Sequence, residues 1–342
     1  MKLRVLFRNS VFVINVGIAL TLLVACLVPY IPAEKFPYLS FLGLGVPIMV
    51  ILNFIFLLYW LLVERRKALL SAVFLMVTYV ISTSFVSFNL TSAPILKDDL
   101  KIMNFNVRSF NRLGRIKNPM LFQETLDFIS QEDPDIICFQ EMDYSKRKDF
   151  KGYPYYFVKF RGMGIRSILG IYSKFPIIDQ GTLDWPDTAN NGAYIDVLYK
   201  KDTIRVYNLH LESYKYHPKK ATISQDMSGR LLNRINSTIQ IQAEQARLFN
   251  LYNDSISYKT IICADLNNTQ YANSYRLIKG DRQDSFLEKG VGLGRTYKSI
   301  GLPFRIDFIF ADPDFEVRAH KNYNIRLSDH FPVMASFRLK DH

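Results

Sequence analysis

Cysteine is scarce in this sequence, with three among 342 residues. Three cysteines do not make a disulfide framework, and Cys26 lies within an apolar stretch. Cys138 and Cys263 each lie in a short apolar run typical of a strand, and we interpret both as small buried hydrophobic residues. The cysteines therefore indicate no disulfide scaffold, and they leave the cellular compartment open.

Charge is absent from three long apolar runs in the first 96 residues. The runs span residues 11–31, 40–63 and 68–88, and a bilayer is crossed by about 20 apolar residues. The third run is the weakest, because serine and threonine make its second half polar. We predict three transmembrane helices at these positions, within a membrane anchor of residues 1–90.

Basic residues orient this predicted anchor. Lys2, Arg4 and Arg8 precede the first apolar run, and the stretch ERRK at residues 64–67 separates the second run from the third. By the positive-inside rule, both basic segments face the cytoplasm. Three crossings then leave the rest of the chain outside the cytoplasmic membrane, which in a bacterium means the periplasm.

A cleaved signal peptide is the alternative for the first apolar run. Residues 23–26 resemble a lipoprotein processing site, but the apolar run continues past Cys26 and two further runs follow. We therefore favour an uncleaved span. Residues 91–97 are expected to form a short linker, and residues 98–342 a soluble domain held close to the bilayer.

The soluble part is mildly basic and mixed in composition. The first 96 residues hold seven of the 43 Lys and Arg and two of the 31 Asp and Glu, which leaves the remainder at about +7 and favours anionic partners without identifying them. Apolar runs typical of strands alternate with helical patterns at residues 118–133 and 237–253, and residues 193–213 indicate a hairpin. This alternation, with hairpins mixed in, predicts an α/β sandwich with mixed sheets.

Most of the predicted strands end in a polar residue of a kind that can act in catalysis or bind a metal. Any single one is more often a residue that ends a strand at a turn. Eight together, with amides, carboxylates and two imidazoles among them, indicate a functional site at the strand ends. They are Asn106, Glu141, His210, Asp265, Asn267, Asp307, Asp329 and His330.

The order of these motifs resembles the endonuclease/exonuclease/phosphatase superfamily, which includes deoxyribonuclease-I-like nucleases, inositol 5-phosphatases and neutral sphingomyelinases. The resemblance extends over about residues 98–339, and it rests on the segments NFN, FQE, LGIYSKFPI, NLHLES, ADLN, RIDFIF and SDHFPV. The last three, in this order, are the most specific. The resemblance implies a four-layer α/β sandwich of two mixed sheets flanked by helices, here preceded by three transmembrane helices.

The resemblance also implies a metal-dependent phosphoesterase. A phosphodiester requires neutralisation of its charge, an activated water and help for the leaving oxygen. Glu141, with Asn106 nearby, corresponds to the Mg²⁺ site, and Mn²⁺ is the alternative ion. Asp329 is expected beside the metal.

Five further residues have roles implied by the resemblance. His330 corresponds to the general base, and Asp307 orients its imidazole. Asp265 is expected to orient or deprotonate the attacking water. Asn267 is expected to hold a phosphate oxygen, and His210 the leaving or a non-bridging oxygen.

The sequence leaves the substrate open between nucleic acid, a phospholipid head group and a phosphorylated small molecule. Lys219 and Lys220 lie in a basic segment after NLHLES, and Arg166 lies in a second basic loop; all three are candidates for contacts with substrate phosphates. We expect a membrane-anchored phosphodiesterase, in particular a nuclease. The alternatives are a lipid phosphodiesterase or phosphatase and a catalytically inactive, membrane-tethered binding module. No protein partner is indicated.

Overall fold

The computed structural model describes residues 2–82, 85–89, 96, 98–158, 167–183, 185, 186, 188, 190–214, 225–298 and 302–340. The chain divides into two compact units, and each is described by itself. Unit 1 comprises Met1–Phe85, His217–Ala243 and Asn268–Arg276, and unit 2 comprises Val86–Tyr216, Glu244–Asn267 and Leu277–His342. Helices α6 (Gln225–Asn253) and α7 (Asn273–Lys279) contribute residues to both units.

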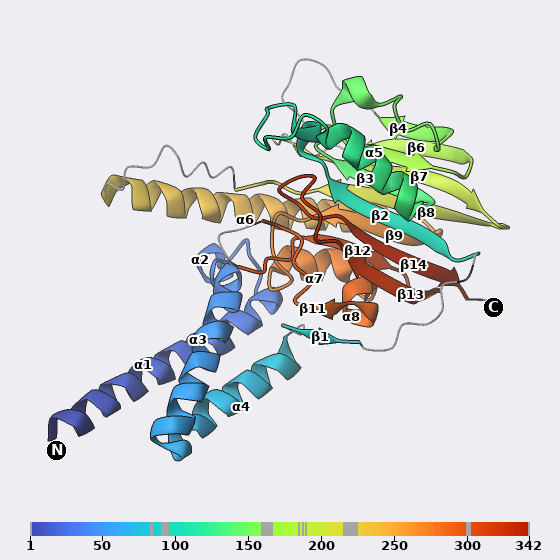
Figure 1. The fold of residues 1–342 in the computed structure, drawn as a ribbon. Helices are drawn as coiled ribbons and strands as arrows, with labels where there is room; N and C mark the ends of the chain where they lie inside the picture. Colours follow the sequence, from blue (N-terminus) through green and yellow to red (C-terminus); the bar gives the residue numbers. More distant parts are fainter. Residues whose placement is uncertain are drawn as a thin grey trace. The chain divides into compact units, whose positions relative to one another are not determined.

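Unit 1 contains a bundle of apolar helices (Figure 1). Its elements are α1 (Lys2–Leu27), η1 (Val28–Tyr30), α2 (Pro37–Ser40), α3 (Leu42–Val63) and α4 (Arg65–Ile81). Within the described part of the chain, two segments are long and apolar enough to cross a membrane, Lys2–Tyr30 and Pro37–Val63. They overlap the first two predicted spans.

The third predicted span, residues 68–88, is longer than the helix that forms there. α4 ends at Ile81, and Ser87–Phe88 form the short strand β1 instead. At 1.5 Å per residue, the 17 residues of α4 extend about 26 Å, less than the hydrocarbon core of about 30 Å. The helix ends where the apolar run gives way to serine and threonine, so the predicted end of this helix was wrong.

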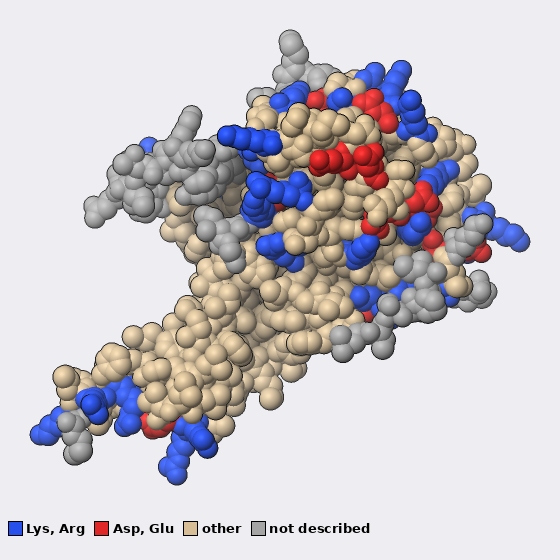
Figure 2. Space-filling view, viewed as in Figure 1, with Lys and Arg blue, Asp and Glu red and all other residues tan. Residues whose placement is uncertain are grey.

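Charged residues gather at one end of the helical bundle (Figure 2). Glu64, between α3 and α4, forms ion pairs with Arg8 of α1 at 3.1 Å and with Lys67 of α4 at 3.3 Å. The Lys67 ammonium also lies 5.1 Å from the ring centroids of Phe12 and Trp60. These contacts place the N-terminal half of α1 and the first turn of α4 beside the last turn of α3, so α1 and α4 run in one direction and α3 in the other.

A buried polar contact joins the three long helices. Asn15 of α1 donates to Ser71 Oγ of α4 at 3.0 Å and accepts from Trp60 Nε1 of α3 at 3.0 Å. Polar side chains among apolar helices are tolerated when they pair with each other in this way. The contact therefore fixes the rotation of each helix about its own axis.

Unit 2 contains two six-stranded mixed sheets, whose strands are labelled in Figure 1. One has the order β10-β12-β9-β8-β7-β6 and the other the order β13-β14-β2-β3-β5-β4. The pairs β8–β9 and β2–β3 are parallel, and the remaining neighbours are antiparallel. The strands are β2 (Leu100–Asn106), β3 (Ile136–Gln140), β4 (Tyr155–Val158), β5 (Gly170–Ser173), β6 (Ile177–Leu183), β7 (Gly192–Tyr199), β8 (Asp202–His210), β9 (Lys259–Asp265), β10 (Gln283–Asp284), β12 (Asp307–Ala311), β13 (Phe315–Asn322) and β14 (Val333–Leu339), with β1 and β11 (Val291–Gly292) paired separately.

Aliphatic side chains from both sheets form the central core of unit 2. On the outer face of the β2–β3 sheet, α5 (Leu121–Glu132) packs through Phe128 and Ile129. On the other sheet, the ring of Phe249 in α6 lies 5.0 Å from that of Tyr207 in β8. The shorter helices are η2 (Arg108–Asn111), η3 (Tyr144–Lys146) and α8 (Ser285–Lys289). The predicted α/β fold, with two mixed sheets flanked by helices, is confirmed.

Three buried amide side chains interrupt the apolar core and link the two sheets. Gln140 of β3 donates to Asn104 of β2 at 2.6 Å and to Asn208 of β8 at 2.7 Å. Asn208 in turn donates to the carbonyl oxygens of Phe139 at 2.9 Å and Gly170 at 3.1 Å. Because buried polar groups are costly unless paired, this network specifies how one sheet registers against the other.

We expect Asn208→Ala to destabilise the protein by about 2–3 kcal/mol, because it leaves a cavity and removes the partners of buried polar atoms. For a unit of this size the melting temperature should fall by roughly 5–10 °C. Thermal unfolding of the detergent-solubilised chain measures this. Asn324→Ala, at an exposed asparagine, is the control and should change the melting temperature little. Equal decreases of the melting temperature in the two variants would show that the amide network does not stabilise the fold.

Candidate active site

Strand pairing in one sheet places three of the predicted residues next to each other. Parallel pairing of β8 and β9 sets His210 opposite Asp265. Antiparallel pairing of β9 and β12 sets Asp265 opposite Asp307. The two parallel strands end at this edge and the antiparallel strand begins there, so the imidazole and two carboxylates share one edge of the sheet.

The other sheet contributes in the same way. Parallel pairing of β2 and β3 sets Asn106, the last residue of β2, opposite Gln140, and Glu141 follows directly. β14 runs antiparallel to β2 and begins at Val333, so the segment with His330 enters from the same edge. The site is therefore assembled from strand ends of both sheets.

His330 and Asp307 form a buried pair. His330 Nδ1 lies 3.0 Å from Asp307 Oδ2 and 3.8 Å from Asp265 Oδ2. Burial alone would lower the pKa of His330, but the neighbouring carboxylates of Asp307 and Asp265 raise it overall. With Nδ1 engaged by Asp307, Nε2 is the nitrogen left for a reacting group.

Asp265 is the residue around which the two sheets meet. Its side chain is fully buried, and its Oδ2 accepts from Asn106 Nδ2 at 2.8 Å. Asn106 Nδ2 also lies 3.3 Å from Glu141 Oε1. Glu141 has a positive φ of 49°, a conformation that costs energy for a residue with a side chain and is common at functional sites. The amide of Asn106 thus bridges two carboxylates.

His210 directs one ring nitrogen into this cluster. Its Nδ1 lies 2.8 Å from Ser167 Oγ. Its Nε2 lies 3.6 Å from Asp265 Oδ2 and 4.0 Å from Glu141 Oε1, and among the described residues this buried atom has no hydrogen-bond partner. Buried polar atoms are normally hydrogen-bonded, so we expect a bound ligand to pair with this nitrogen.

Asn267 and Asp329 lie at the border of the cluster. The backbone N–H of Asn267 donates to Asp265 Oδ1 at 2.9 Å, and its Nδ2 donates to the carbonyl of Leu211 at 2.9 Å. The Asp329 carboxylate forms an ion pair with Arg108 and accepts from Ser328 Oγ at 3.2 Å. Thus the structure gathers the predicted strand-end residues at one edge of unit 2.

The predicted substrate contacts at Arg166, Lys219 and Lys220 lie outside the described residues. They remain predictions from sequence.

Several supporting residues were missed by the sequence analysis. Asn104 and Asn208 each lie two positions before a predicted site residue, and alternation along a strand puts both on the same face as that residue. This spacing was the available signal. Thr296 and Ser167 gave none: Thr296 Oγ1 accepts the backbone N–H of Asp307 at 3.0 Å, and Ser167 contacts His210. Ser167 lies 43 residues from His210 in the sequence, and Thr296 lies 11 residues before Asp307.

The donor atoms in the cluster suit a hard divalent cation, which prefers oxygen ligands. Ligand atoms of Asp265, Asp307 and His330 lie within 4.8 Å of one another. Two buried carboxylates this close repel each other, and burial together with Asp265 raises the pKa of Asp307. The Glu141 side chain is 40% exposed, which leaves it open to an ion and its waters. The residues present therefore fit such a cation.

Solved structures with the same fold include several phosphoesterase-like proteins. The mannosyl-6-phosphatase of Bacteroides thetaiotaomicron VPI-5482 is 20% identical, with a TM-score of 0.54, over 70% of this chain and 100% of that chain. D. rerio TDP2, complexed with a single-strand DNA product, is 17% identical, with a TM-score of 0.53, over 70% of this chain and 99% of that chain. The human Nocturnin catalytic domain with bound sulfate is 14% identical, with a TM-score of 0.53, over 72% of this chain and 96% of that chain. Comparison with curated proteins finds no match.

Two family models match the chain. Residues 8–85 match a domain of unknown function, which corresponds to the helical part of unit 1. Residues 103–330 match the endonuclease/exonuclease/phosphatase family, and this region contains every residue of the cluster described above. The chain therefore belongs to the endonuclease/exonuclease/phosphatase family and is a phosphoric ester hydrolase of that type.

Proposed function

We propose that this chain is a membrane-anchored phosphodiesterase that hydrolyses phosphodiester bonds with the help of Mg²⁺. The observation that supports it best is the convergence of two imidazoles and two buried carboxylates at one edge, where each imidazole lies within 4 Å of a buried carboxylate. They are His210 and His330 with Asp265 and Asp307. Proton transfer and charge stabilisation at phosphorus both require such groups.

In this proposal His330 removes the proton of the attacking water. Asp307 holds Nδ1, which fixes the tautomer and leaves Nε2 to accept the proton. Asp265 orients the water. If Ser167 donates to His210 Nδ1, then His210 Nε2 bears the hydrogen and donates it to a phosphate oxygen. Asn267 holds a second phosphate oxygen.

Glu141 and Asn106 would hold the cation, with Asp329 beside it. When bound, Mg²⁺ or Mn²⁺ supplies positive charge that stabilises the developing charge on the phosphate and leaving oxygens. Asn106 keeps the carboxylates of Glu141 and Asp265 at a fixed separation through its amide.

The proposal is tested with full-length protein in detergent and a substrate panel of plasmid DNA, RNA, a choline phosphodiester lipid and a phosphoinositide. We expect turnover with Mg²⁺ or Mn²⁺, none with EDTA, and turnover about 10³-fold slower by His330→Ala. Cleavage of DNA or RNA makes the protein a nuclease; one similar structure is that of TDP2 with a DNA product. Cleavage of lipid alone establishes the lipid phosphodiesterase alternative. If the wild type neither cleaves any substrate nor binds metal, the result would support the alternative of a catalytically inactive, membrane-tethered binding module.

The anchor is proposed to cross the cytoplasmic membrane three times and to leave the catalytic domain outside. Arg8, Lys67 and the residues between α3 and α4 gather at one end of the bundle, which suits a cytoplasmic end. The directions of the three helices suit three crossings, although α4 is short. Protease added to spheroplasts should then digest residues 98–342. Protection there, with digestion only after lysis, would support two crossings and a cytoplasmic domain.

A further inference from the structure

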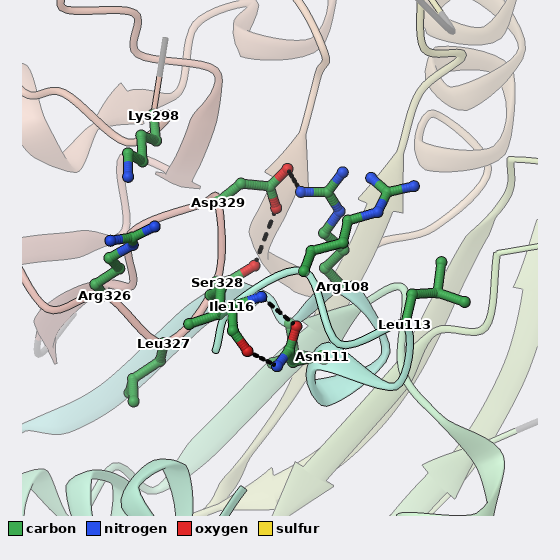
Figure 3. Close-up of a pocket in the computed structure, with 11 residues that line it drawn as sticks. Arg108, Asn111, Leu113, Ile116, Lys298, Arg326, Leu327, Ser328 and Asp329 are labelled. Carbon is green, nitrogen blue, oxygen red and sulfur yellow. Dashed lines mark hydrogen bonds and ion pairs between the residues drawn. The ribbon is translucent and has the colours of Figure 1, made fainter. Parts of the chain in front are cut away.

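A pocket is lined in part by Asp329, and its other lining residues have no role in the chemistry described above. It is part of unit 2 and has a volume of about 160 Å³. One wall is the segment that follows β2, from Val107 to Ile116, and the other is the segment that precedes His330, together with Lys298 (Figure 3). Three segments that are distant in sequence thus enclose one cavity at the border of the site.

The pocket is strongly basic. Four cations line it, Arg108, Arg115, Lys298 and Arg326, against the single acid Asp329. Arg108 is engaged by that acid. Lys298 and Arg326 are exposed, and within the described residues neither forms an ion pair. They lie on one side of Asp329 and Arg108 on the other (Figure 3). Positive charge therefore exceeds negative charge in this cavity, which favours an anion.

The backbone holds the pocket against the catalytic residues. The N–H of Lys298 donates to the carbonyl of Asp329 at 2.8 Å, directly before His330. The N–H of Arg108 donates to Asn106 Oδ1 at 3.1 Å. Asp329, which lines the pocket, directly precedes His330 in the chain. An anion in the pocket would thus lie next to the groups that act on the scissile phosphate.

The wall after β2 is built in a strained conformation. Residues 108–111 all have positive φ, between 44° and 61°, although none is glycine. Such a run costs energy and persists only where other contacts hold it. Asn111 holds the loop through two hydrogen bonds to Ile116, at 2.7 and 2.9 Å, and Ser109 N–H donates to the carbonyl of Glu141. The pocket is therefore pre-shaped.

We infer that this pocket binds a second phosphate of the substrate, adjacent to the scissile one. The inference rests on the proposed function and narrows its substrate class to esters with at least two phosphate groups. A neighbouring phosphate can come from a polynucleotide or from a phosphorylated lipid head group. Lys298 and Arg326 make the charge-assisted contacts, and Arg108 keeps Asp329 from opposing the anion.

The first experiment measures binding without catalysis. Inorganic pyrophosphate is titrated calorimetrically into the detergent-solubilised full chain in EDTA. The expected result is binding that is at least tenfold weaker for Lys298→Ala/Arg326→Ala. A matched loss of two exposed cations outside the pocket, Lys151→Ala/Lys201→Ala, should bind like the wild type. No binding by the wild type, or equal binding by the pocket variant, overturns the inference.

The second experiment measures preference. Each class is represented by a pair of substrates, a thymidine dinucleotide with and without a 5′-phosphate and phosphatidylinositol with and without a ring phosphate. In the class that is cleaved, the additional phosphate should lower KM about tenfold, and the pocket variant should lose that advantage while it retains activity on the plainer substrate. An unchanged preference in the variant overturns the inference. Failure of the proposed function is seen separately, as no metal-dependent cleavage of bis(p-nitrophenyl) phosphate.

Discussion

His330→Ala is expected to lower kcat/KM for phosphodiester cleavage about 10³-fold, within the range of a lost general base. The imidazole is buried and paired to Asp307 at 3.0 Å, and among the described residues no other imidazole has that partner. Asp307→Asn should lower kcat by about 10²-fold or more, because an amide can hold the ring in the wrong tautomer. Initial rates with saturating Mg²⁺ measure both effects.

Folding must be separated from chemistry in these variants. His320→Ala is the matched control, since His320 contacts Ser285 and lies outside the cluster. Rates are compared per folded molecule, with thermal unfolding recorded for each variant. If kcat/KM of His330→Ala fell by less than tenfold, His330 would not be the general base, and Asp265 would be the next candidate.

Glu141→Gln is expected to raise the Mg²⁺ concentration for half-maximal activity at least tenfold and to lower kcat about 10²-fold. An amide is a weaker ligand for a hard cation than a carboxylate, and the exposed Glu141 is the member of the cluster most open to a hydrated ion. Activity measured across a Mg²⁺ series separates the two effects. Calorimetric titration with Mn²⁺ gives the affinity directly.

Glu244→Gln is a suitable control, because Glu244 is similarly exposed and pairs with Arg247 on the surface of α6. It should retain wild-type activity and Mg²⁺ dependence. If Glu141→Gln kept its affinity for Mn²⁺ while it lost activity, Glu141 would act in chemistry and the cation would have other ligands.

The fold of unit 2 was largely predictable because its signals are local. Asn106 was predicted to end a strand, and β2 spans Leu100–Asn106. The helix expected at 237–253 is the second half of α6, whose first half lacks a clear apolar stripe. The third membrane span was misjudged at its polar end, where α4 ends at Ile81 and the chain pairs as β1. Hydroxyl groups can be satisfied in a helix or in a strand, so composition alone did not decide between them.

The sequence by itself determined which chemical groups are available and on which strand each one lies. Asn, Asp, Glu and His after apolar runs indicated the site, because strand periodicity and strand ends depend on neighbours along the chain. Only the tertiary structure decided which groups meet. His210, Asp265 and Asp307 adjoin because of the registers of β8, β9 and β12, which pairing across the sheet sets. The basic pocket has the same origin, since its walls come from three distant segments and no local pattern records their proximity.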